Sequence, residues 1–438
     1  MAATSKQPVN ITFLGPLNRS AGWLLTWVDQ RFPLMENWRA HLAEYYAPKN
    51  FNFWYYFGSL AMLVLGLQIL TGIFLTMHYK PDAGLAFASV EYIMRDVPFG
   101  WLIRYMHSTG ASAFFTVVYL HMFRGLLYGS HRKPRELIWI FGMLIYLTLM
   151  GEAFFGYLLP WGQLSYWGAQ VIVNLFGTIP FVGPDIALWI RGDYVVSDAT
   201  LNRFFAFHVI ALPLVLLALV TAHLLALHEV GSNNPDGVEI KNSLDASGRP
   251  LDGIPFHPYY TVKDIFGVVC FLIIFAIVVF FMPEMGGYFL EDNNFVTADP
   301  LKTPPHIAPV WYFTPFYSIL RAVPPLFNSQ FPGVAAMGAA TLILFLLPWL
   351  DRSPVKSIRY KGPVFKWALG IFTVTFLVLG YLGTVPTNVW GQFGSWLGNA
   401  ERATVVARIG GLIYFAFFVL MPWYSRMDKT KPEPLRVK

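Results

Sequence analysis

Residues 104–124 read RYMHSTGASAFFTVVYLHMFR, an apolar stretch of helical length with a histidine near each end. His107 and His121 are fourteen residues apart. At 100° per residue, fourteen steps return to within about 40° of the same helix face after a rise of about 21 Å. An interior-facing helix would therefore present two imidazoles at two depths.

A second apolar stretch repeats this arrangement with His208 and His223, fifteen residues apart. Fifteen steps overshoot the same face by about 60°, and Pro213 offers a kink or local unwinding that could absorb the extra residue. Two spans that cross a membrane in the same direction have matching depths. We therefore expect His208 level with His107, and His223 level with His121.

The composition indicates a membrane protein. Of the 438 residues, 55% are hydrophobic and 13% charged, whereas about 25% charged residues are typical of soluble domains. Apolar runs of about 17 to 25 residues, the length that crosses a hydrocarbon core of about 30 Å, recur along the chain. We predict an all-α integral membrane protein with eight transmembrane helices, the first four forming a four-helix bundle. The predicted spans are residues 54–78, 101–127, 137–159, 204–228, 260–283, 334–350, 364–384 and 404–424.

The N-terminal segment differs from these spans. Residues 1–10 are polar, so no cleaved signal peptide is expected. Residues 17–46 form an amphipathic pattern interrupted by Pro33, which predicts an interfacial helix on the membrane surface.

Basic residues predict the orientation. Segments on the side of the termini carry 21 Lys and Arg residues, and segments on the opposite side carry nine. The positive-inside rule then predicts cytoplasmic termini and places the long loops 160–203 and 284–333 on the positive side. The first of these loops contains a helical apolar piece, Tyr166–Phe176. The net charge of +6 is thus a topology signal, and no nucleic-acid partner is expected.

Cofactor chemistry follows from the cysteine and histidine content. The single cysteine, Cys270, excludes intrachain disulfides, a zinc cluster, a cysteine-ligated iron–sulfur cluster and a C-x-x-C-H attachment of haem. One histidine in an apolar span could be an ordinary hydrogen-bonded residue. Four at two matched depths, with no Asp or Glu beside either pair, favour bis-imidazole ligation of two non-covalent haem b groups.

Glycines and arginines fit the same two depths. The third span runs opposite to the second, as does the first, and each carries two glycines fourteen residues apart: Gly58 and Gly72, and Gly142 and Gly156. Gly72 and Gly156 fall at the depth of His107, and the other two at the depth of His121. They could admit a flat macrocycle or simply be helix-packing glycines. Arg104 and Arg124 could pair with haem propionates or snorkel to the surface.

Several long motifs resemble the cytochrome b family, the membrane subunit of ubiquinol:cytochrome c reductase. They are LQILTGIFLTMHY (67–79), RYMHSTGAS (104–112), GYLLPWGQLSYWG (156–168), TLNRFFAFH (200–208), HEVGSNNPDG (228–237) and TPPHIAPVWYFTPFYSILRA (303–322). The resemblance implies that His107 and His208 ligate a low-potential haem, and His121 and His223 a high-potential haem.

The resemblance also implies a protonmotive quinone cycle. Quinol would be oxidised near the positive side, and quinone reduced near the cytoplasmic side by an electron that crosses both haems. Implied partners are a Rieske-type iron–sulfur protein, cytochrome c1, membrane lipid and a second copy in a homodimeric complex. The fifteen-residue histidine spacing and the sequence Pro-Val-Trp-Tyr indicate a proteobacterial type in a bacterial inner membrane.

Two other classes compete with this interpretation. A di-haem membrane anchor of another quinone-linked dehydrogenase would share the histidine pairs, but it would not explain the 303–322 segment or the added spans. A transporter or channel would place charged residues at broken helices near the midplane, whereas the ionisable residues near the midplane here are mostly the histidines.

The outer quinol site of the family joins the loop after the third span to the 284–333 segment. The usual Pro-Glu-Trp-Tyr is here Pro309-Val310-Trp311-Tyr312, so the expected proton acceptor is missing. We hypothesise that Glu152 replaces it; a buried carboxylate bonded to a neighbouring helix is the alternative. Residues that could position quinol, or simply be interfacial aromatics, are Tyr157, Tyr312 and Tyr317.

The inner quinone site is expected at the opposite end. His228 follows the ligand His223 by five residues, and Lys263 and Asp264 begin the fifth span on the same side. His and Asp can bond the two carbonyls of a quinone and supply protons. Asp264 could instead be a helix N-terminal charge. Further candidates are Ser59 and Ser232.

The expected organisation has five parts. They are an N-terminal segment (1–50), the di-haem four-helix bundle (51–230), a cytoplasmic loop (231–259), a C-terminal four-helix region with the outer quinol-site loop (260–426) and a basic tail (427–438).

Overall fold

The computed structural model describes residues 18–39, 43–392, 394 and 400–437. Within these residues, eight helices are long and apolar enough to cross a membrane, as predicted. Their bounds are Phe53–Thr76, Gly100–Tyr128, Glu136–Leu158, Asp198–Val230, Phe256–Phe281, Phe331–Leu350, Pro363–Thr384 and Arg402–Val419. The all-α membrane architecture is therefore confirmed.

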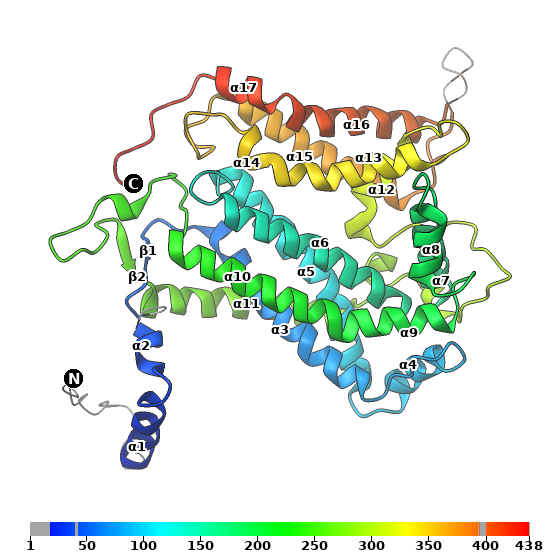
Figure 1. The fold of residues 1–438 in the computed structure, drawn as a ribbon, viewed down its shortest axis with the longest axis horizontal. Coiled ribbons are helices and arrows are strands. Elements are labelled where there is room, and N and C mark those ends of the chain that lie inside the picture. Colours follow the sequence, from blue (N-terminus) through cyan, green and yellow to red (C-terminus); the bar gives the residue numbers. More distant parts are fainter. Residues whose placement is uncertain (1–17, 40–42, 393, 395–399, 438) are drawn as a thin grey trace.

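The first four spans form one bundle (Figure 1). Helix α3 packs along α5, and α10 packs along α6, while α11 covers α3 and α5 from outside. The helix bounds are α3 Tyr56–Thr76, α5 Gly100–Tyr128, α6 Glu136–Leu158, α9 Asp198–Ala206, α10 Leu212–Val230 and α11 Thr261–Phe281. The interior of this bundle holds all four predicted histidine ligands.

The last three spans lie on the other side of α5 and α6 (Figure 1). Helix α12 packs between α13, α15 and α16. The bounds are α12 Thr314–Ala322, α13 Phe331–Leu342, α14 Leu347–Leu350, α15 Pro363–Thr384, α16 Arg402–Val419 and α17 Met421–Met427. The predicted last span, 404–424, breaks at Leu420 because Pro422 lacks the N–H that would continue the helical hydrogen bonding.

Ordered loops cover the end of the bundle nearest His107. They contain the short helices α4 (Ala86–Arg95), α7 (Gln163–Gly177) and α8 (Gly183–Arg191). The predicted helical piece Tyr166–Phe176 lies inside α7. An isolated β-bridge joins Gly162 to Thr297, so the loop after the third span is fixed to the loop after the fifth.

The end nearest His121 is closed by a small sheet. Strand β1 (Tyr46–Pro48) pairs antiparallel with β2 (Gly253–Pro255), with Ala47 opposite Ile254. The C-terminal segment returns to the same place, where Arg436 Nε lies 2.6 Å from Oδ2 of Asp252.

The N-terminal helices project away from the bundle (Figure 1). Helix α1 covers Asn18–Asp29 and α2 covers Leu34–Trp38, with the break at Pro33. Trp23, Leu24 and Trp27 are exposed. Their placement at a membrane surface stays a prediction, and residues 1–17 and 40–42 of the predicted segment lie outside the described residues.

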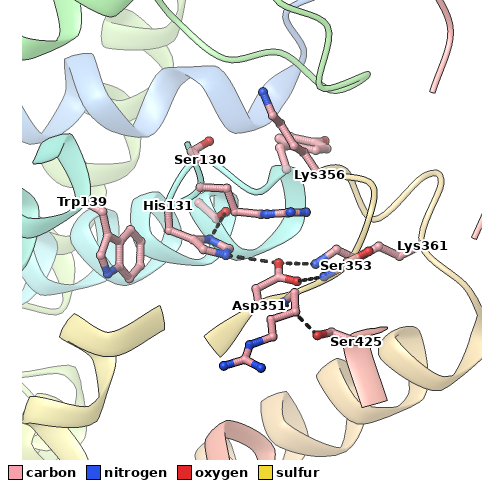
Figure 2. Close-up of polar contacts among 12 residues, drawn as sticks. Ser130, His131, Trp139, Asp351, Ser353, Lys356, Lys361 and Ser425 are labelled. Carbon is pink, nitrogen blue, oxygen red and sulfur yellow. Dashed lines mark hydrogen bonds and ion pairs between the residues drawn. The ribbon is translucent and has the colours of Figure 1, made fainter. Parts of the chain in front are cut away.

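A buried charge cluster joins the two helix groups at the His121 end (Figure 2). Asp351, which follows α14, accepts from Lys361 Nζ at 2.5 Å and lies 3.3 Å from His131 Nε2, and all three side chains are at most 1% exposed. Burial raises the pKa of Asp351, but Lys361 and the hydrogen bond from His131 outweigh burial and hold that pKa below its usual range. The cluster thus connects the α5–α6 turn to the segment before α15.

We predict that Lys361→Met destabilises the fold by about 3–5 kcal/mol, because it leaves the Asp351 carboxylate buried without its cation. Thermal unfolding of the detergent-solubilised protein measures this loss. The matched control is Lys366→Met, a single-lysine change at an exposed position of α15. Equal unfolding temperatures for the two variants would contradict the prediction.

Candidate functional site

The fourth span contains a π-helical turn at Phe207–Ala211, between α9 and α10. The backbone N–H of Leu212 bonds the carbonyl of Phe207, five residues back. Pro213 follows, and its missing N–H cannot restore the α-helical bond to the carbonyl four residues earlier. A π turn holds one extra residue in the helix. The fifteen-residue spacing of His208 and His223 is therefore accommodated where the sequence suggested a local unwinding.

The structure brings the four histidines together as two facing pairs. The ring centroids of His107 and His208 are 6.1 Å apart, and those of His121 and His223 are 6.4 Å apart. Imidazole nitrogens bind a metal at about 2.0–2.1 Å, which puts two ring centroids on opposite sides of one ion about 6 Å apart. Both pairs therefore have the separation that one shared metal ion requires.

Hydrogen bonds at the His107 end select the ligand form of both rings. Thr71 Oγ1 donates to the carbonyl of Leu67 at 2.6 Å, so it accepts from Nδ1 of His107 at 2.9 Å. Nδ1 of His208 donates to the carbonyl of Glu152 at 2.9 Å. With the proton on Nδ1 in both rings, each Nε2 keeps a lone pair for a metal.

Each predicted glycine faces the histidine at its own depth. A Cβ placed on Gly58 would lie 3.3 Å from the His121 ring, and one on Gly142 would lie 3.5 Å from the His223 ring. At the other depth the same test gives 3.4 Å between Gly72 and His107. A Cβ on Gly156 would overlap the His208 ring.

These observations fit a flat, anionic macrocycle between each histidine pair. The glycines leave the space beside the rings free of side chains. Arg104 is partly buried, and its buried Nη1 has no hydrogen-bond partner among the described residues, as expected for a group that awaits an anion. Arg124 already donates to the carbonyl of Asn233 at 3.0 Å. We therefore find Arg104 the better placed of the two for a propionate.

A cavity of about 300 Å³ extends from the His107 pair toward the loops. It is mostly apolar, and its polar lining includes Gln68, Ser108, Ser112, Tyr157 and Asn294. Phe289, Leu290 and Tyr312 close it from the segment after α11. The predicted outer site and the space beside the first histidine pair are therefore one continuous cavity.

The Pro-Val-Trp-Tyr segment forms one wall of this cavity. Val310 and Tyr312 line it, and Tyr312 stacks on Phe115 with ring centroids 3.9 Å apart. Trp311 donates from Nε1 to Ser112 Oγ at 3.1 Å. Pro309 is partly buried just before them. The Tyr317 hydroxyl instead bonds the carbonyl of Ile307 at 3.4 Å.

Glu152 lines the cavity beside a histidine of the first pair. Its Oε1 lies 3.0 Å from Nδ1 of His208, and its Oε2 is buried without a hydrogen bond within the described residues. The single hydrogen of His208 Nδ1 is therefore shared between the Glu152 carbonyl and its carboxylate, and the carboxylate also faces the cavity. An acid thus stands beside this histidine pair, contrary to the expectation of no Asp or Glu there.

Residues at the inner end form two groups. Ser59 Oγ lies 3.3 Å from Asp264 Oδ1, and Tyr55 also approaches this carboxylate. Tyr45 links the second group: its hydroxyl is 3.1 Å from Ser232 Oγ, and its ring is 5.1 Å from that of His228. The Lys263 ammonium lies over the Tyr259 ring instead, 4.4 Å from its centroid.

Sequence reasoning missed several residues of both sites. Thr71 and Tyr55 lie in the first span and Tyr45 lies in the segment before it, and nothing in their spacing separates them from other Thr and Tyr residues. Asn294 and Glu291 lie in a loop whose folding back onto α6 is not visible in the sequence. Glu291 nevertheless precedes Val310 in the same 284–333 segment. A carboxylate in the segment that lacks the motif glutamate was a usable sign of a replacement proton acceptor.

Family comparisons cover most of the chain. Residues 42–231 match the family described as cytochrome b/b6/petB, and residues 297–415 match cytochrome b (C-terminal)/b6/petD. Cytochrome b of Allochromatium vinosum is 66% identical over 417 residues, which cover 94% of this chain and 98% of that protein. Cytochrome b of Rhodospirillum rubrum is 47% identical over 414 residues, covering 94% and 95%.

A solved structure has the same fold. One chain of a hyperthermophilic respiratory complex III superposes with a TM-score of 0.82 and 41% sequence identity. The superposition covers 92% of this chain and 98% of the other.

The glycine contacts generate a prediction about cofactor content. Gly72→Leu should remove about half of the b-type haem absorbance, because its side chain fills the space beside His107. Gly66→Leu on the same helix is the control, since a Cβ there meets nothing within 4 Å. Reduced-minus-oxidised spectra of the purified variants measure the effect, and full absorbance in Gly72→Leu would rule out a macrocycle at this position.

Proposed function

The chain belongs to the cytochrome b family and is the core electron-transfer subunit of a quinol–cytochrome c reductase, and we propose that it performs a quinone cycle through two haem b groups. Quinol is oxidised in the cavity at the His107 end. Quinone is reduced at the His121 end. The electron that crosses between the two sites contributes to the proton gradient.

The facing histidine pairs carry this proposal. His107 and His208 hold the low-potential haem, and His121 and His223 hold the high-potential haem. The 6.1 Å and 6.4 Å ring separations and the free Nε2 atoms at the His107 end support this assignment. Haem, when bound, supplies reversible one-electron chemistry. The chain's own contribution is to fix both imidazoles, exclude side chains at the glycines and offer Arg104 to a propionate.

At the outer site, Tyr157 and Tyr312 position quinol and Glu152 accepts a proton from it. Their shared cavity beside His208 supports these roles. Trp311 and Pro309 shape the wall that holds Tyr312. At the inner site, Asp264 and His228 bond the quinone, with Ser59, Ser232 and Lys263 around them. The Ser59–Asp264 contact supports a polar pocket there rather than an isolated helix-end charge.

The five-part organisation fits this division of labour. Residues 51–230 hold both haems, the described part of residues 260–426 completes the outer site, and residues 43–50, 231–259 and 427–437 lie at the inner end. The family match at residues 297–415 lies outside the haem bundle, so a di-haem anchor of another dehydrogenase explains less of the chain.

The chain is an integral membrane protein of a multisubunit complex. We place it in a bacterial inner membrane with cytoplasmic termini, in a homodimeric complex with membrane lipid around it. A Rieske-type iron–sulfur protein and cytochrome c1 receive the other electron. These partners are required because one cysteine cannot ligate an iron–sulfur cluster or form the two thioether bonds of a C-x-x-C-H haem.

Glu152→Gln tests the outer site. It should slow quinol-dependent cytochrome c reduction by the purified complex by about tenfold or more, because a neutral amide cannot accept the proton. The haem spectrum should stay at the wild-type level. Wild-type turnover at every pH from acidic to alkaline would remove Glu152 from the mechanism.

Asp264→Asn tests the inner site. With the outer site blocked by an inhibitor, reduction of the high-potential haem by added quinol through the inner site should slow by about tenfold. Asp245→Asn, an exposed acid at the same end, serves as the control. Stopped-flow absorbance measures both rates, and equal rates would show that Asp264 is only a helix-end charge.

A further inference from the structure

A second carboxylate, Glu291, lies behind the outer cavity. It stands in the segment after α11, just before η8 (Asp292–Phe295), and it is partly buried. Nδ2 of Asn294 donates to Glu291 Oε2 at 3.1 Å and to the Tyr157 hydroxyl oxygen at 2.9 Å. Glu291, Asn294 and Tyr157 therefore form one polar network between the loop and α6.

The orientation of the Asn294 amide is fixed by α7. Its Oδ1 accepts the backbone N–H of Ser165 at 2.8 Å. A reversed amide would set its NH2 group against another N–H donor, so Nδ2 must point toward Glu291 and Tyr157. Close packing of Gly162 against Asn294 leaves this amide little room to move.

The fixed Asn294 amide therefore also fixes the direction in which the Tyr157 hydroxyl donates its hydrogen. The hydroxyl oxygen accepts from Asn294, which leaves the hydroxyl hydrogen for the Glu291 carboxylate that the same Asn294 amide bonds. A hydroxyl oxygen has a second lone pair. Since Tyr157 lines the cavity, that lone pair is available to a donor inside it.

The surroundings suit a proton acceptor near neutral pH. Burial raises the pKa of Glu291 to about 7, against the hydrogen bonds from its own backbone, Tyr157 and Asn294 and the positive charge of Arg104. The titratable and charged groups facing it are Tyr157 from α6, Tyr312 from η9 (Trp311–Phe313) and Arg104 from α5. A base whose pKa lies near the working pH transfers protons most effectively.

Glu291 also lies close to solvent along the chain, so it can release a proton. Asp292 and Asn293, the next two residues, are exposed. Val310, which lines the cavity where the usual motif has glutamate, is buried and apolar and offers no acceptor. Oxidation of quinol to quinone releases two hydroxyl protons, so a second proton acceptor is needed in addition to Glu152.

We propose that Glu291 is a proton acceptor for quinol in the outer cavity, reached through the Tyr157 hydroxyl. The proposal rests on the proposed function of that cavity. In the transfer, a quinol O–H bond breaks and its hydrogen bonds to the Tyr157 oxygen, while the Tyr157 proton moves to the Glu291 carboxylate. The two electrons leave by the two routes of the proposed quinone cycle, one to the iron–sulfur protein and one across the membrane, and Glu291 later releases its proton to water.

The test uses the purified complex with a short-chain benzoquinol and cytochrome c. Glu291→Gln should lower kcat at pH 7 by about tenfold or more with little change in KM. In the wild type, kcat should fall as pH drops below about 7, because protonated Glu291 cannot accept; this acid limb should vanish in Glu291→Gln and persist in Glu291→Asp. Asp292→Asn, the neighbouring exposed acid, should behave as the wild type.

A double variant tests the route. Tyr157→Phe should lower kcat as Glu291→Gln does, and combining the two should add little, because both interrupt the same transfer. Haem spectra are recorded for every variant. If Glu291→Gln does not retain its haems, Glu291→Asp and Tyr157→Phe decide by the same pH profile.

The outcomes separate this proposal from the function on which it rests. No quinol oxidation by the wild-type complex would overturn the proposed function itself. An active wild type with an unchanged rate and acid limb in Glu291→Gln would overturn only the role of Glu291. A loss of rate that is equal at every pH and is not restored by Glu291→Asp would also overturn it, because it would mark a purely structural contact.

Discussion

The first bundle depends on keeping two imidazoles on opposite sides of a narrow, flat space, at two depths. Ring separations of 6.1 Å and 6.4 Å leave room for one metal ion between each pair. Rotation of the whole fourth span, Asp198–Val230, against α5 would separate both pairs together. Three features meet this one requirement. They are the register of the helices, the glycines that face the rings, and the hydrogen bonds that Thr71 and Glu152 accept from the rings.

The outer cavity follows from the same geometry. Because Glu152 contacts His208 and also lines the cavity, the place where quinol is expected directly adjoins the first histidine pair. Loops from two distant parts of the sequence complete it, and the bridge between Gly162 and Thr297 fixes them to each other. Function at this end therefore depends on loop packing as much as on the transmembrane helices.

The spans and the histidine pairs could be predicted because hydropathy and helical periodicity are local properties of the chain. His107 and His208 lie on different helices, but depth along a span is fixed by residue count alone. The Glu291–Asn294–Tyr157 network could not be predicted in this way, since it depends on how an irregular loop returns to α6. His131 and Asp351 were missed for the same reason: 220 residues separate them, and only the packing of two helix groups joins them.

The π turn at Phe207–Ala211 has an evolutionary consequence. In an uninterrupted α-helix, inserting one residue turns everything beyond it by about 100° and would carry His223 away from His121. A local bulge confines the insertion to one turn, so the rest of α10 keeps its facing. Histidine spacing in this span can therefore differ by one residue between lineages while the two rings keep facing their partners. A pairwise alignment with a relative whose histidines are fourteen residues apart should open its gap within this turn.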